Sequence, residues 1–150
     1  MSAGEPAYPF QSHVGFDVTD WSQDRAKVQL DLAAHHMNRH GIPHGGLHAT
    51  LLDTAMGYAG CWTGDPDRRQ LCLTLNLNVN YIGVARGARL IATGTRTGGG
   101  RTTFFAEGTL EDESGSYPAG TWLRLPQGDA HTPRTSEGCL LWIKTGHLPA

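Results

Sequence analysis

Residues 35–62 read HHMNRHGIPHGGLHATLLDTAMGYAGCW and fall into two halves of different character. The first half is polar and rich in Gly and His. In the second half, apolar residues recur three and four positions apart, which is the period of a helix that buries one face. These residues are Leu47, Leu51, Leu52, Ala55, Met56 and Ala59. Pro43 suits a helix entrance, so the pattern predicts a long core-facing helix that starts at Gly45-Gly46.

Asp53 lies about two turns into this predicted helix, among apolar neighbours. A lone helical Asp is most often solvated or part of a cap. Here, however, an uncompensated carboxylate would be costly, which makes Asp53 the strongest candidate for a chemical role. Gly45 and Gly46 either form a tight turn or offer the free amide groups and positive dipole end of the helix to a developing negative charge.

The composition of the 150-residue chain excludes several classes of protein. The length predicts one domain with a real core. A net charge of -2 gives no electrostatic footprint for nucleic acid, and three distant Cys form neither a disulfide framework nor a metal-ligand set. No apolar run approaches the roughly 18 residues of a membrane span. Reduced thiols and the lack of a signal-peptide pattern predict a cytoplasmic protein.

The rest of the chain is dominated by segments in which apolar and polar residues alternate. They predict strands over 13–19, 26–32, 70–81, 89–96, 101–110 and 117–125. In 70–81 the odd-numbered residues from Leu71 to Tyr81 are apolar and the even-numbered ones are polar, as in an antiparallel sheet with one buried face. Two strands, one long helix and four strands predict an α+β fold, with an antiparallel sheet of five or six strands around one central helix.

Breaks in this pattern predict the domain organisation. Residues 1–12 contain Pro6 and Pro9 and little periodicity, which indicates an N-terminal arm. Residues 13–125 form the predicted domain. Residues 126–150 mix Gly, Pro and Thr, and we predict a C-terminal extension without an assigned role.

Several motifs of this chain resemble those of one family, the hotdog-fold acyl-CoA thioesterases of the phenylacetic-acid-pathway (PaaI-like) type in the 4-hydroxybenzoyl-CoA thioesterase superfamily. The matching residues are Asn38, His44-Gly45-Gly46 and Leu52-Asp53-x-Ala55, followed by Thr74 to Tyr81 and by Gly100-Arg101. The resemblance covers roughly residues 13–125. It implies a hotdog fold and hydrolysis of an acyl-CoA to a carboxylic acid and free CoA. It implies no cofactor, because CoA is part of the substrate.

The resemblance also implies roles for individual residues. Asp53 would be the general base or, alternatively, a nucleophile that forms a mixed anhydride with the acyl group. The amide of Gly45 would polarise the thioester carbonyl. Asn38, otherwise a turn residue, would hold the carbonyl or its loop, and Thr74, otherwise an ordinary strand residue, would help to place the attacking water. His44 is either a further catalytic residue or a loop histidine bonded to the backbone.

Three residues are candidates for substrate binding, namely Gly46, Gly100 and Arg101. Arg101 would reach a CoA phosphate or be solvated. Eight His suggest a metal, but no Cys or carboxylate set joins them at zinc spacing, so we expect no metal site. A Gly-x-Ser-x-Gly elbow is missing, which disfavours a Ser-His-Asp hydrolase.

Two other functions fit the same fold: a dehydratase or hydratase acting on acyl thioesters, and a non-catalytic acyl-CoA-binding protein. The first usually needs a His paired with a carboxylate, whereas the loop position carries Asn38. Gly45 and Asp53 are eight residues apart, which is about 12 Å along a helix. One carbonyl and its attacking water need both groups within about 3 Å. The spacing therefore predicts sites shared between subunits, in a dimer at least, and the resemblance favours a tetramer.

Overall fold

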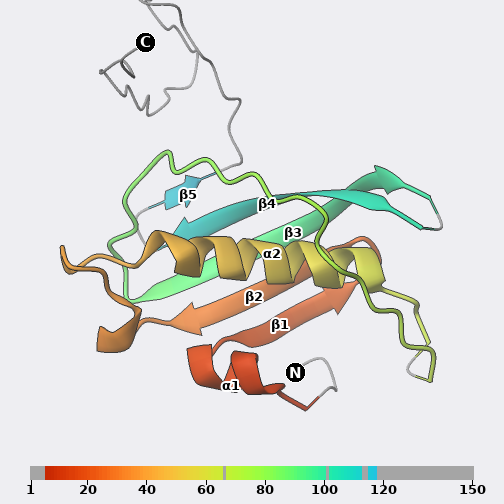
Figure 1. The fold of residues 1–150 in the computed structure, drawn as a ribbon, viewed down its shortest axis with the longest axis horizontal. Coiled ribbons are helices and arrows are strands. Elements are labelled where there is room, and N and C mark those ends of the chain that lie inside the picture. The colour runs from red at the N-terminus through yellow and green to blue at the C-terminus, as the bar shows by residue number, and fades with distance from the viewer. Residues whose placement is uncertain (1–5, 66, 101, 113–114, 118–150) are drawn as a thin grey trace, which may run out of the picture.

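The structure, a computed structural model, describes residues 6–65, 67–100, 102–112 and 115–117 (Figure 1). In chain order the elements are α1 (Pro9–Val14), β1 (Asp17–Ser22), β2 (Arg25–Asp31), the short 3-10 helix η1 (Ala34–His36), α2 (Gly45–Cys61), β3 (Arg89–Gly99), β4 (Phe104–Asp112) and β5 (Gly115–Tyr117). The strands form one sheet, and the long helix α2 crosses one of its faces.

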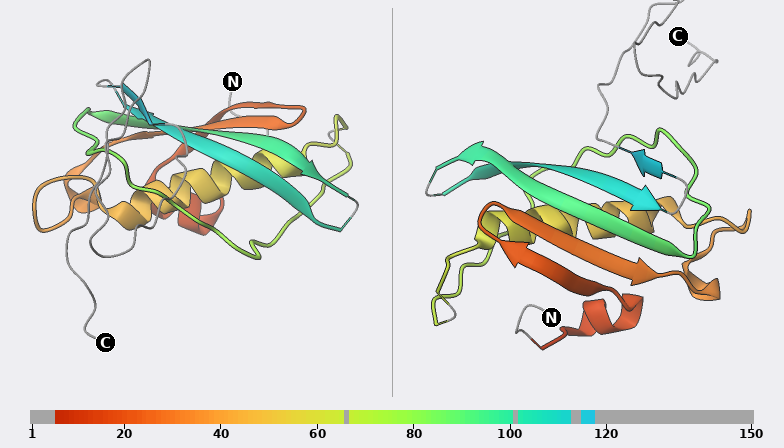
Figure 2. Two further views of the ribbon diagram at one scale, coloured as in Figure 1. Left: turned by 90° about the horizontal axis from the view of Figure 1, so that it is seen from above. Right: turned by 180° about the vertical axis from the view of Figure 1, so that it is seen from behind.

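The sheet has the order β1-β2-β3-β4-β5, and every neighbouring pair is antiparallel. Four strands have six or more residues, and the three-residue β5 pairs only with the end of β4. Figure 2 shows the sheet as one layer and α2 as the second. The predicted α+β class, an antiparallel sheet with a central helix, is therefore confirmed.

The core lies between α2 and the facing side of the sheet. Its fully buried residues include Val28, Leu30 and Leu90 from strands, Leu51 from the helix, and Phe16 from the connection just before β1. Two glycines let the helix approach closely: a Cβ on Gly94 would lie 2.4 Å from the backbone of Ala55, and one on Gly108 would lie 2.9 Å from Leu52 Cδ2. Small residues in β3 and β4 thus set the distance between helix and sheet.

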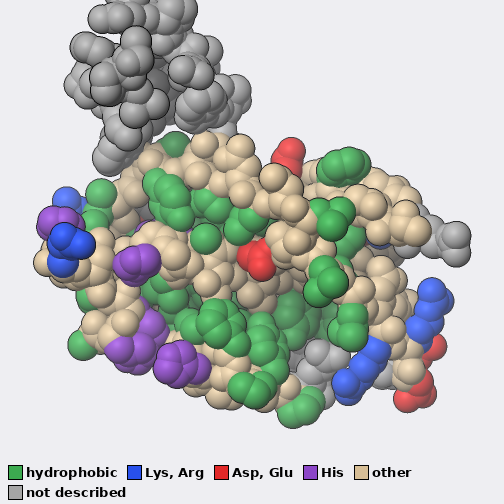
Figure 3. Space-filling view, viewed as in Figure 1, with side chains coloured by type: hydrophobic (Ala, Val, Ile, Leu, Met, Phe, Trp, Pro, Cys, Tyr) green, Lys and Arg blue, Asp and Glu red, His purple; other side chains and the backbone are tan. Residues whose placement is uncertain are grey.

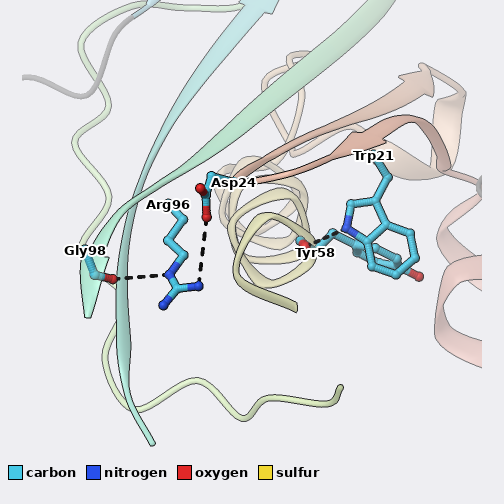
Figure 4. Close-up of polar contacts among 5 residues, drawn as sticks. All are labelled: Trp21, Asp24, Tyr58, Arg96 and Gly98. Carbon is cyan, nitrogen blue, oxygen red and sulfur yellow. Dashed lines mark hydrogen bonds and ion pairs between the residues drawn. The ribbon is translucent and has the colours of Figure 1, made fainter. Parts of the chain in front are cut away.

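Polar contacts fasten the first hairpin to the other elements (Figure 4). Trp21 Nε1 on β1 donates a hydrogen bond to the carbonyl oxygen of Tyr58 near the end of α2, at 2.7 Å. At the β1–β2 turn, Asp24 has a φ of 57° and its carboxylate lies 3.9 Å from the guanidinium of Arg96. Asp tolerates this left-handed conformation better than most residues.

The prediction of a strand over residues 70–81 is wrong. This segment forms no strand and instead runs antiparallel to α2, with Cys72 beside Gly57, Thr74 beside Asp53 and Tyr81 beside Gly45. In its first half the polar side faces the helix, through Cys72 and Thr74, and three leucines predicted to point inward are outside: Leu71, Leu73 and Leu75 are 91%, 91% and 82% exposed. Only towards its end does the apolar side turn inward, where Val79 packs against the core. Alternation specifies two faces of an extended chain, but it does not specify which element that chain contacts.

The first predicted strand, 13–19, is also partly wrong. Helix α1 runs to Val14 and ends at Gly15, which has a φ of 89°, so β1 begins only at Asp17. Pro9 in the first helical turn and a left-handed glycine after the last are start and stop signals that override the short alternation. Part of the predicted arm, 1–12, is therefore helical.

Other boundaries shift by a few residues. The predicted strand 89–96 continues in β3 to Gly99, and the predicted strand 101–110 corresponds to β4, which begins at Phe104 and ends at Asp112. The predicted strand 117–125 lies outside the described residues except for Tyr117, and so does the whole extension 126–150. No helix of the described residues is both long and apolar enough to cross a membrane.

Candidate active site

Asp53 and Thr74 meet on the outer side of α2. Asp53 is half-buried, and the hydroxyl of Thr74 donates a hydrogen bond to its Oδ1 at 2.7 Å. Leu52 and Ala55, on either side of Asp53 in the sequence, are buried in the core, which fixes this part of the helix. The hydroxyl of Thr74 thus orients the Asp53 carboxylate. Sequence analysis predicted Thr74 in the site, but on a strand, whereas it lies in the irregular segment alongside α2.

Tyr8 is a residue near Asp53 that sequence analysis missed. Burial raises the pKa of the Tyr8 phenol, a hydrogen bond with Thr54 lowers it, and the negative charge of Asp53 raises it again. The Tyr8 phenol is therefore near enough to the Asp53 carboxylate for the charge of Asp53 to affect its pKa. It precedes α1 directly, in the segment predicted to be an arm, where no periodic pattern marks it.

At the N-terminal end of α2, His44 caps the helix. Its Nδ1 accepts a hydrogen bond from the Gly46 amide at 2.9 Å, so in the neutral ring the proton is on Nε2. His44 is therefore bonded to the backbone, as one of the two alternatives from the sequence has it, and a catalytic role for His44 stays a prediction. The same bond corrects the expectation for Gly46, whose amide is not free to bind an anion.

The amide of Gly45 has a different environment. It is the first residue of the helix, where an amide has no intrahelical acceptor, and no described residue accepts a hydrogen bond from it. The carbonyl of Gly45 accepts a hydrogen bond from the hydroxyl of Tyr81 at 2.8 Å. Gly45 therefore keeps the donor that the sequence assigned to it, and Tyr81, which ends the matching stretch Thr74 to Tyr81 but was given no role, lies beside it.

Asn38 organises the loop before the helix. Its Oδ1 accepts a hydrogen bond from the His40 amide at 2.8 Å, and its backbone amide donates to the Ile42 carbonyl at 2.8 Å. This is the geometry of a turn residue. Asn38 shapes the polar loop that leads to Gly45, and so far its contacts support the role of holding that loop.

The remaining substrate-binding candidates are not gathered here. Gly100 lies in the β3–β4 turn, where its amide donates to the Thr103 carbonyl at 2.7 Å. Phe104, at the start of β4, packs against Gly60 near the C-terminal end of α2, far along the helix from Gly45. Arg101 lies outside the described residues.

Histidines cluster near the start of α2 (Figure 3). Together with apolar neighbours they line a groove of about 260 Å³, to which His13, His35, His36 and His44 contribute. His36 is buried and bonded on both sides, with Nδ1 accepting from the Ala33 amide and Nε2 2.8 Å from the Val14 carbonyl. Within the described ranges, no group of three or more His, Cys, Asp or Glu is arranged to hold a metal ion. At least two of the clustered histidines have structural roles.

Comparison with known proteins places this geometry in context. The chain is 35% identical over 75 residues to the Pseudomonas aeruginosa protein named "Putative esterase PA0474". The matched residues make up 50% of this chain and 54% of that relative, so this chain spans about half of the relative's length. The structure of the conserved protein PA5202 from Pseudomonas aeruginosa is similar with a TM-score of 0.66 and 27% identity, over 74% of this chain and 87% of that one. The phenylacetic acid degradation protein PaaI from Thermus thermophilus is similar with a TM-score of 0.61 and 25% identity, over 71% and 88%.

The family profile that matches describes a different architecture. It is the ChrR Cupin-like domain, and it matches residues 79–149, just under half of the chain. Cupins are double-sheet β structures. The matched range includes β3, β4 and β5, and these strands belong to the same single sheet as β1 and β2, which packs on α2. The described fold is similar to that of a thioesterase from Haemophilus influenzae. The match crosses the boundary predicted between residues 125 and 126, and its second half lies outside the described residues.

Several solved structures are similar in fold to the described residues of this chain. The proteins that share this arrangement include thioesterases and PaaI. The described part of the chain therefore has the hotdog architecture of the PaaI-like thioesterases, and the resemblance predicted from the sequence is confirmed.

Proposed function

We propose that this protein hydrolyses an acyl-CoA thioester to a carboxylic acid and free CoA. The observation that carries the proposal is the Asp53–Thr74 pair: a half-buried carboxylate between the buried Leu52 and Ala55 of the helix, oriented by a hydroxyl 2.7 Å away. The likeness to thioesterases and to PaaI supports the reaction class. The free thiols of Cys61 and Cys72 suit the reducing cytoplasm in which we expect it to act.

In this proposal Asp53 removes a proton from a water molecule, whose oxygen attacks the thioester carbonyl. The Gly45 amide donates a hydrogen bond to the carbonyl oxygen as it gains negative charge, which the positive end of α2 also favours. The C–S bond then breaks, and the CoA thiolate takes up the proton held by Asp53. Direct attack of Asp53 on the carbonyl, followed by hydrolysis of the anhydride, uses the same groups.

One chain does not place these groups together. Gly45 and Asp53 both lie on α2 and are separated by about 12 Å along its axis. We therefore propose that each site combines Gly45 of one subunit with Asp53 of another, in a dimer at least and, by resemblance, a tetramer. The exposed leucine row of Leu71, Leu73 and Leu75, which follows α2, is an apolar surface that a second copy would cover.

The first test measures thiol release from a panel of acyl-CoAs, beside hydration of an enoyl-CoA. We expect thiol release by the wild type, and a loss of at least about 100-fold in kcat for Asp53→Asn and Asp53→Ala, because general-base contributions reach that size. Circular dichroism and the melting temperature would show that both variants are folded. Asp65→Asn, in the exposed loop after α2, is the matched control.

The other outcomes separate the competing functions. Hydration of the enoyl-CoA without thiol release would favour a hydratase. Binding of acyl-CoA with neither reaction would favour a non-catalytic binding protein. An Asp53→Asn variant that keeps more than about a tenth of the wild-type kcat would exclude Asp53 as base or nucleophile.

A further inference from the structure

The first two residues of α2 are both glycines, Gly45 and Gly46. Glycine has more backbone freedom than any other residue, so a pair of glycines at a helix start does not fix its own orientation. The proposed function nevertheless needs the Gly45 amide to point in one direction, because an oxyanion donor acts only within hydrogen-bond distance of the developing charge. Groups outside the pair therefore have to hold it.

Side chains bond to the backbone groups around this amide. The Tyr81 hydroxyl donates to the Gly45 carbonyl at 2.8 Å, and the Gly46 amide donates to Nδ1 of His44 at 2.9 Å. The carbonyl and the amide belong to one planar peptide, which is thus held from both sides. The Thr50 hydroxyl also donates to the Gly46 carbonyl at 2.9 Å. Of the two glycine amides, only that of Gly45 has no acceptor among the described residues.

The missing side chains of the two glycines make room for these contacts. A Cβ on Gly45 would lie 3.3 Å from Cε1 of Tyr81, and a Cβ on Gly46 would lie 3.0 Å from Nδ1 of His44. The ring of Tyr81 therefore lies directly against Gly45 as well as bonding to it. Tyr81 comes from the segment alongside α2 and is 46% exposed, so the core does not depend on its hydroxyl.

We propose that Tyr81 and His44 are positioning residues, which hold the peptide between Gly45 and Gly46 so that the Gly45 amide is aimed at the thioester carbonyl oxygen. This inference rests on the proposed thioesterase function. Fixing that peptide fixes the Cα atom of Gly45, to which the free amide is attached. In this assignment His44 acts through its bond to the Gly46 amide and transfers no proton.

The first experiment measures kcat and KM with the acyl-CoA that the wild type hydrolyses fastest. Tyr81→Phe removes only the hydroxyl. We expect kcat to fall about fivefold to tenfold, the usual value of one net hydrogen bond, with little change in KM. Tyr58→Phe makes the same chemical change about 20 Å along α2 from Gly45 and is the matched control, which should keep the wild-type kcat. Melting temperatures would show that both variants are folded.

Two variants of His44 separate positioning from proton transfer. His44→Ala removes the acceptor of the Gly46 amide and should lower kcat by a similar factor. Asn is a favoured residue at this position of a helix, and its side-chain oxygen accepts a hydrogen bond from the same amide. His44→Asn should therefore restore most of the activity. A residue that transfers a proton would not be replaced by an amide, so equal losses in the two variants would overturn the assignment of His44.

NMR relaxation of the Gly45 amide nitrogen tests the proposal without catalysis. We expect an order parameter of about 0.85 in the wild type and in Tyr58→Phe, as in a rigid backbone, and a value closer to about 0.6 in Tyr81→Phe. An unchanged kcat in Tyr81→Phe would overturn the proposal. If the wild type hydrolyses no acyl-CoA, the thioesterase function fails. A lower order parameter in Tyr81→Phe would then still support the holding of this amide, and equal values would overturn it.

Discussion

At the scale of single residues, the hydrogen bond between Thr74 and Asp53 is the contact whose loss is easiest to interpret. Thr74→Ala leaves the carboxylate in place but removes the group that orients it. We expect kcat to fall about tenfold with little change in KM, because the interaction acts on the reaction rather than on CoA binding. Thr74→Ser keeps the hydroxyl and should retain most of the activity. A change in KM alone would assign Thr74 to the binding surface instead.

His48 gives a second prediction, which concerns pH and stability. Its pKa in the folded state is below that of the unfolded chain, mainly because of burial. Below the unfolded pKa near 6.5, the unfolded state therefore binds more protons, so this group makes the protein less stable as the pH falls. Melting temperatures between pH 7 and pH 5 should fall less in His48→Leu than in the wild type, by on the order of 2 °C. Identical pH dependence would contradict this, and His13→Leu, at an exposed histidine, serves as the control.

The residues of the candidate site show how far sequence reasoning reaches. It predicted that Asp53 and Thr74 belong to one site, and the structure brings the two side chains into contact, while their catalytic roles and that of Gly45 stay predictions. It could not tell that His44 would occupy the Gly46 amide, since two ring nitrogens and a short loop allow many geometries. Tyr8 was missed because it reaches Asp53 from an aperiodic segment.

At the scale of elements, helix α2 was predictable and the segment after it was not. The helix has its own periodicity, a cap and a buried face, so its bounds follow from local sequence. Residues 70–81 alternate as regularly, but a strand also needs an edge with which to pair. In the described residues β5 pairs with the end of the outer edge of β4, and residues 70–81 run alongside α2 instead. Partner choice is a property of the tertiary structure, which alternation alone does not encode.

The exposed leucines of this segment lead to a prediction about assembly. Leu73 is 91% exposed, so Leu73→Lys should leave the melting temperature of an isolated chain almost unchanged. If a second copy covers the row, the same substitution should shift the mass in solution toward the monomer and lower activity by at least tenfold. Light scattering on the eluting protein measures this. Phe105→Lys, at a residue 68% exposed on β4, is the matched control, and equal effects of both variants would remove the leucine row as the interface.

At the scale of the whole molecule, the decisive question is how many chains build one site. The fold alone, one sheet with one helix across it, gives each chain a single copy of Gly45 and Asp53 at separate positions on α2. Sequence spacing already predicted this separation, because a helix has a fixed rise per residue. What it could not supply is the relative placement of two chains, since that depends on surfaces whose exposure becomes visible only in the folded structure.

Complementation between two inactive variants tests the shared site directly. Asp53→Ala removes the carboxylate, and Gly45→Val adds a side chain at the helix start, where even a Cβ would lie 3.3 Å from the Tyr81 ring. Each protein alone should be inactive. After subunit exchange, half of the dimers are mixed, and each mixed dimer has one site with an intact Gly45 and an intact Asp53. We therefore expect about a quarter of the wild-type activity, from the symmetry of a two-fold dimer. Exchange confirmed by mass with no return of activity would mean that each site is built within one chain.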